Sequence, residues 1–292
     1  MTEPYVEANS LSKSFGPKVV LRDVTLAVEP GDVIGVLGKN GAGKTTLLEL
    51  MLGFTPASSG HVQIFGHDSL RLPASSKSRI GFVPQLDELI AHLTGRDQLK
   101  VISSFYSGWN DALVARLAQR WEIALDDRIR DMSIGQRQKL SILLALGHEP
   151  DLLILDEPVA SLDPVARRYF LEELVDIATD RERAVILSSH LVSDIERLAN
   201  KIWIVKDNTL YWAGDFDELR ESIVRLHIRS TRPLAKPIEI PNALSIEVGE
   251  SHATAVVRDS SAALCRRIED ASGGKVEVEA LTLEDIFVEF HR

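Results

Sequence analysis

Residues 38–45 read Gly-Lys-Asn-Gly-Ala-Gly-Lys-Thr, and this stretch decides the fold of the chain. An apolar run at 32–37 comes before it, and a segment of helical character at 46–52 follows it. In such a strand–loop–helix context, glycines let consecutive backbone N–H groups point at a phosphate, beside the positive end of the helix. Lys44 can bridge two phosphates of the bound molecule, and the Thr45 hydroxyl can hold Mg²⁺. The sequence therefore predicts a loop that binds a nucleoside triphosphate.

The composition narrows the class of protein. The 292 residues leave room for one large domain or two. Cys265 is the single cysteine, which excludes an internal disulfide and favours a reducing compartment. With 33 basic against 43 acidic residues the net charge is −10, so we expect no nucleic-acid partner. No apolar run reaches the ~18 residues of a membrane span, and the first residues lack the pattern of a secretion signal.

Two carboxylates, Asp156 and Glu157, close a second apolar run at 152–155. Such a run is typical of a buried parallel strand, and it opens onto a site at its carboxyl end. The first carboxylate can order Mg²⁺ there, and the second can polarise the water that attacks a phosphate. Taken alone, the run fits equally well a strand that ends at the surface.

Two further polar residues follow short apolar runs. His190 comes after the run at 184–189, and it is either a structural residue or a contact to the γ-phosphate. Gln85 comes after the run at 79–84, and its neutral amide can bind Mg²⁺ or orient water. These strand ends become informative because a phosphate loop accompanies them.

A fifth segment, Met-Ser-Ile-Gly-Gln at 132–136, is similar to the Leu-Ser-Gly-Gly-Gln signature of ATP-binding cassette (ABC) proteins. With it, the segments at 38–45, 85, 152–157, 161–163 and 190 follow the order of Walker A, Q-loop, Walker B, D-loop and switch histidine. Over about residues 5–220 the chain resembles the nucleotide-binding subunit of an ABC transporter. The ending Leu-Glu-Asp-Ile-Phe at 283–287 resembles ATPases of ABC-2 type exporters.

The resemblance implies an α/β fold of the P-loop NTPase class. Residues 1–220 would form the ABC ATPase domain, a mixed-sheet core with a helical subdomain at about 88–147. Residues 221–292 would form a small C-terminal α+β domain.

The resemblance also assigns roles to site residues. Glu157, His190 and Gln85 would be catalytic, and Thr45, Gln85 and Asp156 would hold Mg²⁺. Ser133, Gly135 and Gln136 of the signature would act on a partner's nucleotide, and Asp163 of the D-loop would communicate across the interface. ATP itself would be bound by Phe15, Gly38, Asn40, Gly41, Ala42, Gly43, Lys44, Thr45 and Thr46. Phe15 stands at the family's adenine-stacking position, which is usually Tyr, but stacking needs only the face of the ring.

The implied function is ATP hydrolysis that powers export through a separate integral membrane permease. The chain would work at the cytoplasmic face of the cell membrane, in a head-to-tail dimer with a second copy or a homologous ATPase subunit, and ATP would join the two. The alternatives are a non-transport ABC ATPase and a regulatory ATP sensor. A translation-factor type would carry two cassettes joined by a basic linker, and a chromosome-maintenance type would carry long heptad repeats. The chain has neither feature.

One residue departs from the family pattern. Ile134 replaces the first glycine of the signature. A β-branched residue with positive φ would be a strained outlier, so we expect an ordinary helical φ at this position. Ser133 Oγ and the Gly135 N–H then remain as the donors to the partner's nucleotide. The alternative is a damaged site without ATPase activity, against which the intact Glu157 and His190 argue.

The remaining regions give patterns of secondary structure. Helical spacing over 94–125 is typical of the helical subdomain, and three aromatic residues, Phe105, Tyr106 and Trp109, would form either an exposed docking patch or internal core. In the C-terminal region the sequence predicts a strand at 225–229 and a hairpin of 245–248 with 253–257. A helix at 260–271 would end at Gly273, before a last strand at 276–278.

Overall fold

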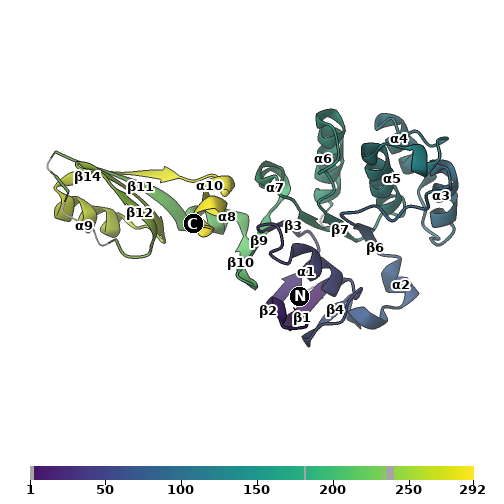
Figure 1. The fold of residues 1–292 in the computed structure, drawn as a ribbon, viewed down its shortest axis with the longest axis horizontal. Helices are drawn as coiled ribbons and strands as arrows, with labels where there is room; N and C mark the ends of the chain where they lie inside the picture. The colour runs from purple at the N-terminus through teal and green to yellow at the C-terminus, as the bar shows by residue number, and fades with distance from the viewer. Residues whose placement is uncertain (1–2, 181, 232, 235–239) are drawn as a thin grey trace. The chain divides into compact units, whose positions relative to one another are not determined.

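The computed structural model describes residues 3–180, 182–231, 233, 234 and 240–292. It divides into two compact units, residues 1–213 and 214–292, whereas the sequence placed the domain boundary at 220 and 221. Figure 1 shows the elements of both units. In the part of the chain that is described, no helix is both long and apolar enough to cross a membrane.

The first unit contains a six-stranded sheet in the order β10-β9-β3-β8-β7-β6. The pairs β9–β3, β3–β8, β8–β7 and β7–β6 are parallel. Three central strands consist entirely of buried residues, as parallel strands covered on both faces require. Its strands are β3 (Val33–Leu37), β6 (Ile80–Val83), β7 (Leu152–Asp156), β8 (Ala184–Ser188), β9 (Lys201–Lys206) and β10 (Thr209–Asp215).

A second sheet of this unit has the order β2-β1-β4-β5, and its neighbours are antiparallel. The strands are β1 (Val6–Phe15), β2 (Lys18–Val28), β4 (Ser59–Ile64) and β5 (His67–Asp68). One apolar core joins both sheets to α1 (Lys44–Met51), with members such as Leu21, Met51 and Ile154. The helix that begins at the glycine loop is therefore fixed between the two sheets.

Three helices form the region in which the sequence predicts a helical subdomain. They are α3 (Gly95–Ser103), α4 (Asp111–Arg120) and α5 (Ile134–Leu146), and both α3 and α4 contact α5 (Figure 1). The predicted helical stretch is thus two helices with a break between them. The other helices of the unit are α2 (Ala74–Lys77), α6 (Pro164–Ala178) and α7 (Val192–Leu198), with 3₁₀ turns at Ser69–Arg71 and Ile129–Asp131.

The three aromatic residues between α3 and α4 divide between the two predicted alternatives. Phe105 is 75% exposed. Tyr106 stacks on the His148 ring with centroids 4.0 Å apart, and Trp109 packs so closely on Gly147 that a Cβ there would lie 2.4 Å from its ring. Tyr106 and Trp109 are therefore partly buried by packing, and of the three residues only Phe105 is an exposed ring.

The second unit has its own antiparallel sheet, in the order β12-β13-β11-β14. Its strands are β11 (Ile223–Ser230), β12 (Ala243–Val248), β13 (His252–Arg258) and β14 (Gly274–Ala280), and its helices are α8 (Phe216–Ser222), α9 (Ala262–Ser272) and α10 (Leu283–Phe290). The predicted hairpin, helix and last strand are confirmed. Helix α9 ends at Gly273, which has a φ of 63°, and its Ile268 packs on Leu226 and Ala255 of the sheet.

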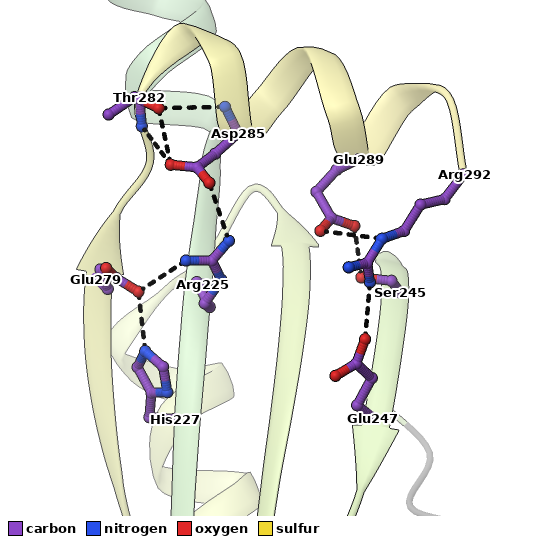
Figure 2. A network of polar contacts seen from close by, with 9 residues as sticks. All are labelled: Arg225, His227, Ser245, Glu247, Glu279, Thr282, Asp285, Glu289 and Arg292. Carbon is purple, nitrogen blue, oxygen red and sulfur yellow. Dashed lines mark hydrogen bonds and ion pairs between the residues drawn. The ribbon is translucent and has the colours of Figure 1, made fainter.

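The other face of this sheet carries a network of polar contacts, which joins it to α10 (Figure 2). Arg225 reaches from β11 to Glu279 of β14 at 3.1 Å and to Asp285 of α10 at 3.4 Å. His227 contacts the same Glu279 oxygen at 2.9 Å. Hydrogen bonds from His227 and then Arg225 lower the pKa of Glu279. Thr282 and Asp285 form a capping box that fixes the start of α10.

Candidate functional site

The glycine loop connects β3 to α1, and its glycines are needed for two different reasons. Gly41 and Gly43 have φ of 78° and 108°, in the left-handed region that favours glycine. A Cβ on Gly38 would instead lie 2.8 Å from the backbone oxygen of Val205. The loop therefore has the folded-back backbone that aims N–H groups at a phosphate.

Lys44 is the first residue of α1, and its ammonium group is turned back over the loop. The side chain is 7% exposed, and Nζ donates to the Gly38 oxygen at 2.8 Å. Nζ also lies 3.9 Å from Oε1 of Glu157. A buried cation placed between a carbonyl and a carboxylate can be shared with an anionic ligand that enters the loop.

The two predicted carboxylates lie at the carboxyl end of β7. Asp156 pairs with Ser188 of β8, and the Ser188 hydroxyl donates to Asp156 Oδ1 at 2.5 Å. The same hydroxyl oxygen accepts from the backbone N–H of Glu157 at 2.9 Å. Glu157 has a φ of 50°, which is uncommon for a residue other than glycine. Ser188 thus holds the carboxylate of Asp156 and the backbone of Glu157. This role was not predicted from the sequence, although a hydroxyl ends this buried strand.

Glu157 is joined to His190 as well as to Lys44. The backbone N–H of His190 donates to Glu157 Oε2 at 3.1 Å, and its ring Nδ1 lies 2.7 Å from the same oxygen. One carboxylate oxygen therefore faces the lysine and the other faces the histidine. The structure thus brings Lys44 to a carboxylate that follows it by more than a hundred positions in the sequence, and His190 to the same carboxylate across 33 positions.

A cleft of about 510 Å³ lies over the loop. Its lining contains most of the predicted nucleotide-binding residues together with Gln85, and it adds two that the sequence analysis missed, Lys18 and Val20. Lys18 pairs with Phe15 across the turn between β1 and β2. The lining residues are Phe15, Lys18, Val20, Asn40, Gly41, Gly43, Lys44, Thr45, Thr46, Gln85, Asp156 and Glu157.

The three predicted Mg²⁺ ligands all line this cleft: Thr45, Gln85 and Asp156. Among the described residues, no three His, Cys, Asp or Glu side chains form a metal-binding group. All three side chains offer oxygen donors, and one of them is a carboxylate. This donor set fits Mg²⁺, because that ion is commonly bound through one or two carboxylates and completes its shell with phosphates and water.

The signature segment begins α5, and it is not part of the cleft lining. Ser133 is the N-cap, and its Oγ accepts from the Gln136 N–H at 3.2 Å. Ile134 is the first helical residue, without positive φ and 60% exposed, so the predicted helical conformation is confirmed. A Cβ on Gly135 would lie 3.1 Å from the Ser161 oxygen. Glycine is therefore favoured by space at 135 and not required at 134.

Gln136 is engaged within its own chain. Its Oε1 accepts from the Ala124 N–H at 3.0 Å, and its Nε2 donates to the Glu122 oxygen at 3.0 Å. Glu122 has a φ of 50°. In this structure, the amide of Gln136 stabilises the turn after α4.

Asp163 caps α6 and lies close to the signature helix. Its Oδ1 accepts from the N–H groups of Ala166 and Val165, each at 2.9 Å. These bonds, that of Ala166 first, hold the pKa of Asp163 below its usual range. The other oxygen lies 3.9 Å from Nζ of Lys139 on α5. The D-loop and the signature helix therefore contact each other within one chain.

A further ion pair connects the segment after Gln85 to the signature helix. Arg137 Nε lies 2.9 Å from Oδ2 of Asp87, and Nη1 of the same arginine donates to the Met132 oxygen at 3.0 Å. Neither Arg137 nor Asp87 was predicted from the sequence to be a site residue. This pair therefore connects the segment after Gln85 to the start of the signature helix.

Comparison with known proteins gives relatives over most of the first unit. The family model described as ABC transporter matches residues 21–160. The ABC transporter ATP-binding protein YtrB of Bacillus subtilis is 32% identical over 223 residues, which cover 76% of this chain and 76% of the relative. The Nod factor export ATP-binding protein I of Paraburkholderia xenovorans is 33% identical, over 71% of this chain and 69% of the relative.

Solved structures agree on the fold. The ATP-binding subunit of an ABC transporter superposes with a TM-score of 0.68 and 27% identity, over 74% of this chain and 92% of that chain. A dimeric ATP-binding cassette in a post-hydrolysis state, bound to ADP and Pi, superposes with a TM-score of 0.64 and 21% identity. The match covers 72% of this chain and 98% of that chain. The predicted fold class is confirmed.

Proposed function

The chain belongs to the ABC transporter family as an ATP-binding and ATP-hydrolysing subunit, and we propose that it powers export through a separate membrane permease. Export is supported by the relatives named as export ATP-binding proteins and by the resemblance of residues 283–287. The permease, an integral membrane protein, would hold this subunit at the cytoplasmic face of the membrane. In this proposal the transport path lies in that second protein.

The cleft over the glycine loop is where we place ATP. The loop N–H groups and Lys44 would hold the phosphates, and Phe15 would stack on the base. Thr45, Gln85 and Asp156 would hold Mg²⁺, which neutralises phosphate charge when bound. Gly38 and Ala42 lie outside the cleft lining and would contribute through the shape of the loop.

Glu157 is the residue we propose as general base. The observation that carries this role is its contact with Lys44 on one side and His190 on the other. A carboxylate held at the edge of the phosphate site can accept the proton of an attacking water. His190 would orient that carboxylate, and Gln85, two residues after the end of β6, would contact the same region.

The signature would act on the ATP of a second copy. Ser133 and Ile134 are exposed, and Ser133, Gly135 and Gln136 lie outside the cleft lining of their own chain. In a head-to-tail dimer each copy closes the other's site, with Ser133 Oγ and the Gly135 N–H as phosphate donors. Gln136 would support the segment through the turn at 122–124. Asp163, beside Lys139, would connect the two sites.

Phosphate release by purified Glu157→Gln protein tests this assignment. Loss of a positioned general base should lower turnover about 100-fold or more while ATP still binds. Glu284→Gln, an exposed carboxylate of α10, is the matched control and should hydrolyse ATP at the normal rate. Near-normal turnover in Glu157→Gln would exclude Glu157 as the base.

A further inference from the structure

Lys13 is a buried lysine near the end of β1, and its ammonium group has unusual partners. The side chain is 7% exposed. Its Nζ donates to Thr55 Oγ1 at 3.0 Å and to the Pro56 oxygen at 2.7 Å. No described carboxylate lies within ion-pair distance of it. A buried charge without a counter-ion is costly, so the neutral groups around Nζ must stabilise it.

The third partner of the ammonium group is the ring of Phe15. Nζ lies 4.6 Å from the ring centroid, within the range of a cation–π interaction. Such an interaction is stronger where the cation is removed from water, which is the case for Lys13. The two residues are therefore held against each other at the end of one strand.

Phe15 needs such a contact to keep its position. Its ring is 50% exposed, it lines the nucleotide cleft, and it precedes a turn in which Gly16 has a φ of 58°. A half-exposed ring on a turn can adopt several rotamers, and a base that stacks on it must select one of them. With the cation on one face, the ring is fixed before the base arrives.

The other contacts of Lys13 lie in the segment that follows the helix of the phosphate loop. Thr55 and Pro56 lie in the segment that follows α1, the helix whose first residue is Lys44. Lys13 therefore joins the strand that presents Phe15 to the segment after α1, the helix whose first residues are phosphate-binding groups. A nucleotide would contact Phe15 and the start of this helix at once, so the position of the ring determines how well base and phosphates fit together.

We propose that Lys13 is a positioning residue for the nucleotide base, acting through Phe15. The inference rests on the proposed role of Phe15 as the base-stacking residue. It predicts that Lys13 contributes to the part of nucleotide affinity that depends on the base and leaves the part that depends on the phosphates unchanged.

The experiment compares a nucleotide with its phosphates alone. Calorimetric titration gives the Kd of the non-hydrolysable analogue AMP-PNP and of inorganic triphosphate for wild type, Lys13→Met, Phe15→Ala and the double variant. Loss of the cation–π contact should weaken AMP-PNP binding by Lys13→Met about 3- to 10-fold. Triphosphate should bind as it does to wild type. In the Phe15→Ala background, Lys13→Met should have no further effect, because the ring through which it acts is gone.

Arg220→Met is the matched control. Arg220 lies over the ring of Phe216 at 5.6 Å on α8 of the second unit, so this variant removes a cation from an aromatic face elsewhere. Both affinities should stay at their wild-type values.

The outcomes separate this inference from the proposed function. If Lys13→Met weakens AMP-PNP and triphosphate equally, or weakens AMP-PNP just as strongly without Phe15, Lys13 only supports the fold and the inference is wrong. If Phe15→Ala leaves AMP-PNP affinity unchanged, the base-stacking assignment fails and this inference fails with it. Should Lys13→Met not fold, Thr55→Val removes one acceptor of Nζ and should give the same selective loss at a smaller size.

Discussion

The nucleotide cleft and the signature segment lie in the same compact unit, but they are built in opposite ways. In the cleft, the charged side chains of Lys44, Asp156 and Glu157 are buried and bonded to one another or to Ser188 and His190. The signature presents Ser133 and Ile134 at the surface of a helix terminus. The cleft has the groups to bind a nucleotide by itself, whereas the role that we propose for the signature segment requires a second copy.

Lys44→Ala tests the nucleotide cleft, and of the three substitutions Lys44→Ala, Gly135→Ala and Ile134→Gly it should have the largest effect. Removal of a charge-assisted phosphate contact should weaken ATP binding about 10- to 100-fold. Calorimetric titration with ATP in the absence of turnover measures this loss of affinity. Lys77→Ala on α2 is the surface control and should bind ATP as wild type does. Unchanged ATP affinity would contradict the placement of the phosphates at this loop.

Gly135→Ala tests the signature half and should have an intermediate effect. The added methyl would lie 3.1 Å from the Ser161 oxygen, so the D-loop must move. If the crowding raises the activation free energy of hydrolysis by about 1 kcal/mol, turnover should fall roughly fivefold. Nucleotide affinity should not change, because Gly135 does not line the cleft. A weakened ATP affinity with normal maximal turnover would show that the two regions are not separate in this way.

Ile134→Gly should have the smallest effect of the three. The residue is exposed and already helical, so restoring the family glycine should leave turnover within about threefold of wild type. Thermal unfolding should show a loss of up to about 1 kcal/mol from added backbone entropy. A hundredfold gain in turnover would mean that the native signature is defective and that the chain acts as a regulatory ATP sensor.

Sequence alone predicted the cleft well because its parts are local. The loop at 38–46 is contiguous, and Asp156, Glu157 and His190 each stand at the end of an apolar run. The carboxyl ends of parallel strands meet at one edge of a sheet, so these residues could be placed together without coordinates. The hairpin and helix of the second unit were predictable for a similar reason, since turn residues and alternation are short-range signals.

Contacts between distant residues were not predictable. Ser188 bonds to Asp156 across 32 positions, Lys13 to Thr55 across 42, and Arg137 to Asp87 across 50. Each of these contacts depends on strand register or helix packing, which short-range sequence patterns do not predict. The same holds for the polar network of Figure 2, which joins three strands to α10.

Size-exclusion chromatography tests the central claim, that the signature of one copy closes the cleft of another. The Glu157→Gln protein should elute as one copy without nucleotide and as two copies with ATP and Mg²⁺. Ser133→Arg in this background would place a bulky cation where the second copy's phosphate must lie, so it should remain a single copy with ATP. Ser107→Arg, an exposed serine between α3 and α4, should still dimerise. An ATP-dependent dimer of the Ser133→Arg protein would contradict the head-to-tail arrangement.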